Sequence, residues 1–190
     1  MPRARPLTLA WRPALRAGVL LVYIVGVEWA RTLVPMVSGL AVAGLVVGGL
    51  ALMVAAWGWS PPQLGLGTSR IWLRLIGGLA LAAVLLLPAA VRSSAVPVLP
   101  LSLAAAAVAV SVGEEIAFRG ALFAALEEMG GAPLAVVGTT LAWTAAHALS
   151  HPPEFLATVA AAGLLLGLWR YACRDLVAPI IGHVIADLAL

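Results

Sequence analysis

The sequence predicts an all-α fold, a polytopic membrane bundle of six to seven helices and at most eight. The mean hydropathy is +1.09, 63% of the residues are hydrophobic and 10% are charged, which is far outside the range of soluble globular domains. Long apolar runs alternate with short segments rich in Pro, Gly and Arg, as in successive membrane-spanning helices. A chain of 190 residues that forms such a bundle has no room for a separate soluble domain.

Seven apolar segments are predicted to be helical, and they cover residues 14–34, 36–57, 71–91, 101 to about 129, 133 to about 150, about 154 to 173, and 176–190. Pro35 ends the first segment, and the second is rich in Gly and Ala, which let helices pack closely. Residues 58–70, with two prolines and three glycines, are predicted to be a loop. The fourth segment contains a charged cluster, a Gly-Gly pair separates it from the fifth, and the seventh is short for a full crossing.

The basic residues predict the orientation in the membrane. All eleven are arginines, and with the N-terminus inside, two of them, Arg31 and Arg92, lie at non-cytoplasmic helix ends. Eight lie at cytoplasmic ends, namely Arg3, Arg5, Arg12, Arg16, Arg70, Arg74, Arg170 and Arg174. The positive-inside rule therefore predicts a cytoplasmic N-terminus. No dense basic run with interleaved aromatics occurs, so nucleic acid is not an expected partner.

Ionisable side chains inside apolar segments are the main functional signal, because such groups are costly in a bilayer and mark sites. Glu115 and Arg119 are four residues apart in the fourth segment, so they share a helix face and can pair. Glu114 lies about 100° further around the helix axis and is expected to lack that partner. An unpaired carboxylate in a dry pocket suits a general acid or base.

The fifth and last segments each add a pair with one-turn spacing. Trp143 and His147 form the first pair, and His183 and Asp187 form the second. Each pair projects from one helix face and can look into a shared cavity. A glutamate and a histidine together can take a proton from water, and a second His with an Asp can orient a carbonyl group or stabilise its oxyanion.

In order along the chain, these residues resemble the motifs EExxxR, FxxxH and HxxxN/D of the CPBP family of intramembrane proteases, also called the ABI or type II CAAX-prenyl endopeptidase family. The stretch Phe118-Arg-Gly-Ala-Leu-Phe, the glycines Gly163 and Gly167, and Pro179 add to the resemblance, which covers about 101–188. The chain accordingly divides into N-terminal transmembrane helices at 1–100 and a catalytic helix core at 101–190.

The resemblance implies an endopeptidase whose active site opens to the membrane and needs no metal or other cofactor. It implies that Glu114 and His147 activate water, that His183 and Asp187 bind the oxyanion, and that Glu115 and Arg119 support the site. The expected partners are a peptide or protein substrate in the membrane and the lipid bilayer. The sequence is rich in alanine and has arginine but no lysine, which is typical of a high-GC bacterium. The expected location is therefore a bacterial cytoplasmic membrane.

Two positions depart from the family pattern. Trp143 stands where the family usually has Phe, which should keep the packing but narrow or reshape the pocket. Asp187 stands where Asn is common, and an ionised Asp cannot donate a hydrogen bond. Asp187 is therefore expected to hold His183 in the donor tautomer, unless it is itself protonated and donates to the oxyanion.

Other functions stay open. Two His and a Glu could bind zinc with an open position, although the HExxH spacing is absent. A non-catalytic immunity or scaffold protein could use the same cavity, and a small proton-coupled transporter ranks last because paired broken helices are missing. Glu28 and Arg31 are expected to form a local pair at the interface, His151 to be solvated or interfacial, and the first three segments to be generic. The sequence does not specify the substrate.

Overall fold

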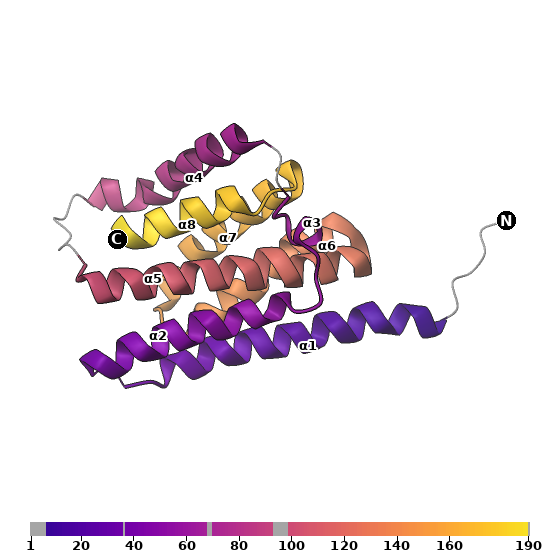
Figure 1. Ribbon diagram of the computed structural model, residues 1–190, viewed down its shortest axis with the longest axis horizontal. Helices are drawn as coiled ribbons and strands as arrows, with labels where there is room; N and C mark the ends of the chain where they lie inside the picture. Colours follow the sequence, from indigo (N-terminus) through magenta and orange to yellow (C-terminus); the bar gives the residue numbers. More distant parts are fainter. Residues whose placement is uncertain (1–6, 36, 68–69, 93–98, 190) are drawn as a thin grey trace.

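The computed structural model describes residues 7–35, 37–67, 70–92 and 99–189, and this part of the chain consists of helices and turns without a strand (Figure 1). The predicted fold class is thereby confirmed. The long α-helices are α1 (Leu7–Thr32), α2 (Ser38–Met53), α4 (Ile71–Arg92), α5 (Leu101–Glu114), α6 (Phe123–Ala146), α7 (Pro153–Cys173) and α8 (Val177–Ala189). The shorter elements are η1 (Val54–Ala56), α3 (Pro61–Leu64), the π-helix η2 (Glu115–Leu122) and η3 (His147–Leu149).

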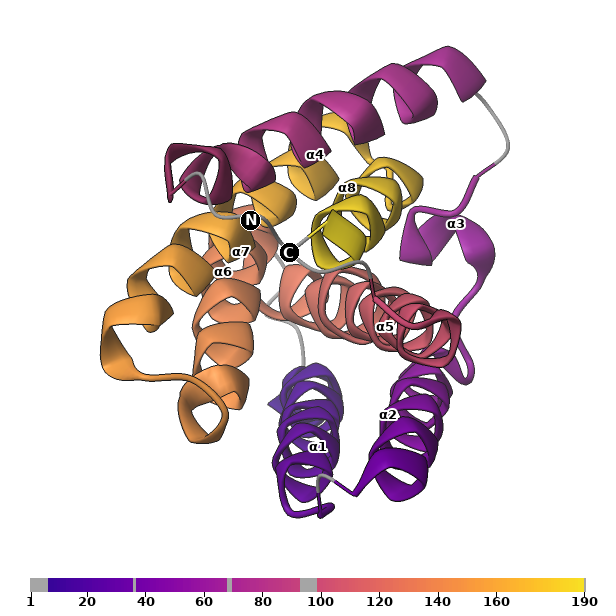
Figure 2. The ribbon, with the colours of Figure 1, turned by 90° about the vertical axis from the view of Figure 1, so that its left-hand side faces the viewer.

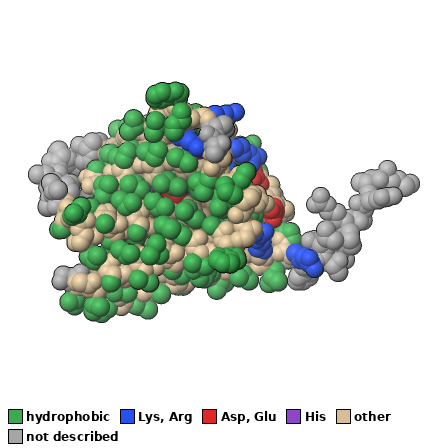
Figure 3. Space-filling model, in the orientation of Figure 1, with side chains coloured by type: hydrophobic (Ala, Val, Ile, Leu, Met, Phe, Trp, Pro, Cys, Tyr) green, Lys and Arg blue, Asp and Glu red, His purple; other side chains and the backbone are tan. Residues whose placement is uncertain are grey.

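Five helical stretches within the described residues are long and apolar enough to cross a membrane. One of them, Leu101–Leu149, contains α5, η2 and α6 and turns at Gly130 and Gly131, whose backbone dihedrals are not helical. Gly131 has a φ of 77°, which favours glycine. The flank of the molecule is covered by hydrophobic side chains (Figure 3). With such a surface, the protein is an integral membrane protein.

The helices pack in two connected groups. In one, α5 lies between α2 and α8, and α8 in turn packs on α4. In the other, α6 lies between α1 and α7. Seen end-on, α5 is near the middle of the molecule, with α1 and α2 to one side of it and α8 and α4 to the other (Figure 2). The π-helix η2, which continues α5, packs on α6 and α1 and so connects the two groups.

Small residues let α2 and α5 touch backbone to backbone. A Cβ atom at residue 49 would lie 2.4 Å from the carbonyl O of Ala109, and one at residue 113 would lie 2.3 Å from the carbonyl O of Gly49. Gly49 and Gly113 are therefore required for this approach, as is usual where membrane helices cross closely. The contact fixes the backbone of the residue that follows Gly113, which is Glu114.

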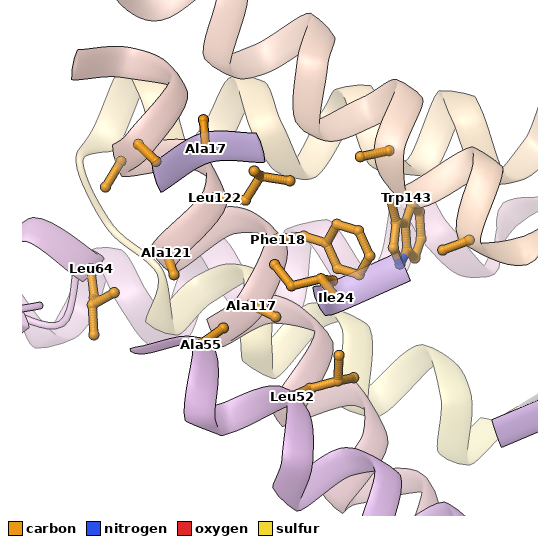
Figure 4. Close-up of a cluster of buried hydrophobic side chains, with 14 of the residues drawn as sticks. Ala17, Ile24, Leu52, Ala55, Leu64, Ala117, Phe118, Ala121, Leu122 and Trp143 are labelled. Carbon is orange, nitrogen blue, oxygen red and sulfur yellow. The ribbon is translucent and has the colours of Figure 1, made fainter. Parts of the chain in front are cut away.

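The main hydrophobic core lies around η2. Phe118, Ala117, Ala121 and Leu122 of this segment pack with side chains from α1, α2, η1, α3 and α6 (Figure 4). In a regular α-helix, residues three or four apart stay on the same side of the helix. A π-helical stretch of eight residues has more residues per turn, so side chains after it point in other directions than α-helical spacing predicts. This shift was not predicted from the sequence.

Some element boundaries differ from the predicted ones. α1 begins earlier than predicted, at Leu7, and runs through Pro13. The predicted loop 58–70 contains the short helix α3, which starts at two prolines and is capped by Ser60 and Gln63. The predicted boundaries at Met36 and Leu190 lie outside the described residues.

The two ends of the bundle carry different charges. We call the end at which α1 and α4 begin and α7 ends the arginine-rich end, because its described arginines are Arg12, Arg16, Arg70, Arg74, Arg170 and Arg174. The other end, where α6 ends and α7 begins, we call the His151 end. Most of the charged side chains visible in Figure 3 lie toward the right, where α1 begins. Arg3 and Arg5 of the orientation argument lie outside the described residues.

Candidate active site

A cavity of about 380 Å³ lies within the described bundle, and five of the seven site residues that the sequence singles out line it. Glu114 of α5, Trp143 of α6, His147 of η3, and His183 and Asp187 of α8 all line it. The remaining wall is mostly apolar and comes from α4, α7 and α8, with Arg31 from α1. The structure thus brings together three segments that are separated in the sequence, namely α5, the junction of α6 and η3, and α8.

Glu114 is 3% exposed and has two partners in the structure. Its Oε1 accepts a hydrogen bond from Arg31 Nη2 at 3.1 Å, and its Oε2 accepts one from Trp143 Nε1 at 2.7 Å. Glu114 does not pair with Arg119, as expected, but the expectation that its carboxylate is unpaired is wrong, because Arg31 comes from another helix. Both oxygens of the carboxylate are held by donors, so its orientation is fixed.

The first helix contributes a second buried carboxylate. Arg31 also donates to Glu28, one turn earlier, and Glu28 is 2% exposed. The expected local pair is present, but it lies in the interior and not at the interface. Gly48 of α2 leaves the space that Arg31 occupies, since a Cβ there would lie 2.7 Å from Arg31 Cδ. α1 is therefore part of the site and not a generic span.

Glu115 is shared by two donors. Its Oε1 lies 2.9 Å from Arg119 Nη1 and 2.9 Å from His183 Nδ1, and both Glu115 and Arg119 are completely buried. The Arg119 guanidinium also lies over the Trp143 ring, 4.1 Å from its centroid. The predicted Glu115–Arg119 pair thus exists, and it positions both His183 and Trp143.

Asp187 has a different neighbour from the one expected. His183 Nε2 lies 3.4 Å from Asp187 Oδ2, whereas its Nδ1 makes the close contact to Glu115. A carboxylate can only accept, so His183 Nδ1 donates to Glu115. Glu115, and not Asp187 as expected, therefore holds the ring of His183. Asp187 Oδ2 lies 2.7 Å from Ser111 Oγ, a polar contact that sequence reasoning did not identify.

His147 is held in one tautomer by the backbone. Its Nδ1 lies 2.8 Å from the carbonyl O of Trp143, and because a carbonyl only accepts, Nδ1 carries the proton. In the neutral ring the lone pair is then on Nε2. The Trp143 ring meets the His147 ring edge to face, with centroids 4.8 Å apart, and it meets the His183 ring in the same way at 5.5 Å.

A third histidine lies at the edge of the cavity. His151 is half-buried, its ring stacks on Phe155 with centroids 4.8 Å apart, and its centroid lies 5.3 Å from that of His147. It lines the cavity, which a solvated loop residue would not do. Burial, with His147 nearby, lowers the pKa of His151 below its usual value, which favours the neutral ring.

Metal ligation has no obvious place among the described residues, where no three His, Cys, Asp or Glu side chains are grouped as a metal site requires. Glu114 is bound by Arg31 and Trp143, and His183 by Glu115, so two of the candidate zinc ligands are already engaged by donors or acceptors of the protein.

Comparison with known proteins identifies the family. Residues 96–189 match the family model described as type II CAAX prenyl endopeptidase Rce1-like. The chain belongs to this family. Neither a search of curated proteins nor a search of solved structures gave a match. The Rce1-like region contains every residue of the three motifs, whereas Glu28 and Arg31 lie outside it.

Proposed function

We propose that this Rce1-like protein is a glutamate-dependent intramembrane endopeptidase in which Glu114 and His147 activate water. The observation that carries the proposal is that both side chains line one cavity, and that the contact of His147 Nδ1 with the Trp143 carbonyl puts the lone pair of the neutral ring on Nε2. A fixed carboxylate and an imidazole with a free lone pair are the two groups needed to take a proton from water.

The same geometry supports a sequence of steps. Water placed between Glu114 and His147 gives up a proton as its oxygen attacks the peptide carbonyl. The oxyanion that forms lies toward His183, whose Nε2 can donate when the ring is doubly protonated. Glu115 and Asp187 on either side would balance the charge of that ring. The proton taken from water then passes to the leaving amine, so that the peptide bond breaks without a net proton change.

The arginine distribution supports a cytoplasmic N-terminus in a bacterial inner membrane, with a membrane-associated or secreted peptide or protein as substrate. The described arginines gather at the end where α1 begins, as the positive-inside rule requires for a cytoplasmic face. Apolar side chains on the bundle surface provide contact with lipid (Figure 3).

The test uses proteins that the membrane itself supplies. The purified protein and its Glu114→Gln variant are each reconstituted into liposomes with detergent-solubilised inner-membrane proteins, and new protein N-termini are identified by mass spectrometry. We expect N-termini that the wild type produces and Glu114→Gln does not. Equal sets of N-termini from both proteins would contradict the proposal.

Two controls separate the alternative functions. Incubation with 1,10-phenanthroline, together with metal analysis of the purified protein, addresses zinc chemistry. We expect unchanged cleavage after chelation, whereas stoichiometric zinc whose removal abolishes cleavage would favour a metalloprotease. A non-catalytic scaffold function predicts instead that cells carrying Glu114→Gln behave like wild-type cells and unlike cells without the protein.

A further inference from the structure

The cavity lies toward the His151 end of the bundle. Arg31 is next to last in α1, His147 follows the last residue of α6, and Phe155 is in the first turn of α7. Asp187 is in the last turn of α8, which ends on the left in Figure 1. The exposed part of the cavity wall is here, since His151 is half-buried and the side chain of Asp187 is 33% exposed.

Packed side chains separate the cavity from the arginine-rich end. The chain runs from Glu114 through η2 toward that end, and every residue from Ala117 to Ala125 is buried. Further on, Arg170 is buried and donates to the carbonyl O of Arg119 at 3.1 Å and to that of Gln63 at 2.8 Å. A substrate therefore reaches Glu114 from the His151 end or from the lipid beside it.

The positions of the exposed arginines indicate which end of the bundle faces the cytoplasm. Among the arginines whose side chains the structure describes, Arg31 is the one that lies at the His151 end. It is bound by Glu28 and Glu114 inside the bundle. It is therefore not placed to meet lipid headgroups. By contrast, Arg12, Arg70 and Arg174 at the other end are exposed, as expected for the cytoplasmic face.

We propose that the cavity opens on the non-cytoplasmic face, so that the substrates are exported or membrane-anchored peptides whose scissile bond lies in or just beyond the outer leaflet. The nature of the cleavage rests on the proposed function, but the side on which the cavity opens does not. A bond at a cytoplasmic chain end, such as that of a prenylated C-terminal tail, would lie on the wrong side of the packed η2 segment.

The cavity wall adds a requirement on the substrate. The apolar side chains of Leu85, Phe155, Val159, Ala162 and Leu166 also line the cavity. This wall suits an apolar side chain next to the scissile bond. The carbonyl must meet Glu114 and His183 together, so the peptide has to leave its own helical hydrogen bonding at this position.

Sidedness can be measured without a substrate. Cys173 is the single cysteine, so a Cys173→Ser protein provides a background for one new cysteine at a time. Glu154 at the start of α7 and Glu128 near the turn of α6 are both exposed and lie at opposite ends, so Glu154→Cys and Glu128→Cys form a matched pair. Right-side-out spheroplasts are treated with a membrane-impermeant maleimide, before and after permeabilisation.

We expect Glu154→Cys to react in intact spheroplasts and Glu128→Cys to react after permeabilisation alone. The reverse pattern overturns the proposal, and so does labelling of both or of neither before permeabilisation. Reaction of both cysteines after permeabilisation is the control for accessibility. The same result is expected in a Glu114→Gln background, because the orientation does not depend on catalysis.

A second arm tests the substrate class. A single-span reporter carries a cleavage sequence found among the new N-termini, either just outside or just inside the membrane. We expect cleavage of the outer reporter alone, and cleavage of the inner reporter alone or of both overturns the proposal. If no cleavage sequence is found, the endopeptidase function fails, while the maleimide pattern still decides on which side the cavity opens.

Discussion

Trp143 makes one hydrogen bond that the phenylalanine usual at its motif position could not make. Its indole N–H donates to Glu114, its ring lies under the guanidinium of Arg119, and its edges meet His147 and His183. The sequence predicted a reshaped pocket from the size of the side chain. The structure shows in addition a hydrogen bond that holds the carboxylate on which the proposed chemistry depends.

Replacing Trp143 with Phe should lower turnover without unfolding the protein. The change keeps an aromatic ring but removes one hydrogen bond to a charged group, which contributes about 1.5–3 kcal/mol. If that interaction matters in the transition state, kcat should fall by roughly 10- to 100-fold with little change in KM. Steady-state cleavage of an identified substrate measures both constants.

The matched control is Trp169→Phe, because the Trp169 indole bonds to Asp175 outside the cavity. This variant should retain the kcat of the wild type. Equal losses in the two variants would mean that the Trp143 effect is a general consequence of removing an indole.

Arg31 is the residue whose loss should be most costly to stability within α1. The change Arg31→Met leaves Glu28 and Glu114 buried without their cation, and removing one member of a buried ion pair typically costs about 3–5 kcal/mol. We expect a clear fall in Tm, measured in detergent, and a smaller fall for Arg31→Lys, which keeps the charge.

Arg12→Met serves as the control for Arg31→Met, since Arg12 lies on the same helix and is exposed. Adding Glu114→Gln to Arg31→Met should recover part of the lost Tm, because it removes one of the two stranded charges. A Tm for Arg31→Met equal to that of Arg12→Met would contradict the role of Arg31.

At the scale of elements, η2 helps to determine which side chains Glu114 and Glu115 contact. Helical geometry alone predicted that Glu114 and Glu115 point in different directions, and in the structure they contact different side chains. The identity of those partners depends on the π-helical stretch and on the contact between α2 and α5. Neither has a periodic signal in the sequence, because the α2–α5 contact joins segments far apart in the chain and the π-helical stretch departs from the α-helical period.

The α2–α5 contact makes a prediction about Gly49. In Gly49→Ala the new methyl group would press on the carbonyl of Ala109, and overpacking of this kind usually costs about 1–3 kcal/mol. We expect a lower Tm in detergent and lower turnover, since α5 carries Glu114. Gly39→Ala is the control on the same helix, because a Cβ there has nothing within 4 Å and its Tm should not fall.

At the scale of the whole molecule, hydropathy and motif spacing predicted the fold class and the family, because both are local patterns. The same patterns placed Glu114, His147, His183 and Asp187 on segments that the structure brings to one cavity. The contribution of α1 was missed, since Arg31 and Glu114 are 83 residues apart and nothing near Arg31 in the sequence indicates a distant partner. The roles of these residues in catalysis stay predictions.

The packing of the first helices predicts that residues 101–190 will not function alone. α1 packs on α6, α2 on α5 and α4 on α8, and Arg31 supplies the cation that Glu114 needs. Expressed without 1–100, this part should be degraded or inactive, and co-expression of the two parts should restore cleavage. Full activity from 101–190 by itself would show that the N-terminal helices are dispensable.

The most direct measurement of the central claim is turnover of Glu114→Gln, His147→Ala and the double variant, each checked for a folded state by Tm. If the two residues activate one water, each single change should lower kcat by about 10³-fold, within the range for general acid–base catalysis. The double variant should then be no worse than the more damaged single variant, since residues that act as a unit are not additive. Normal turnover in either folded single variant would contradict the account.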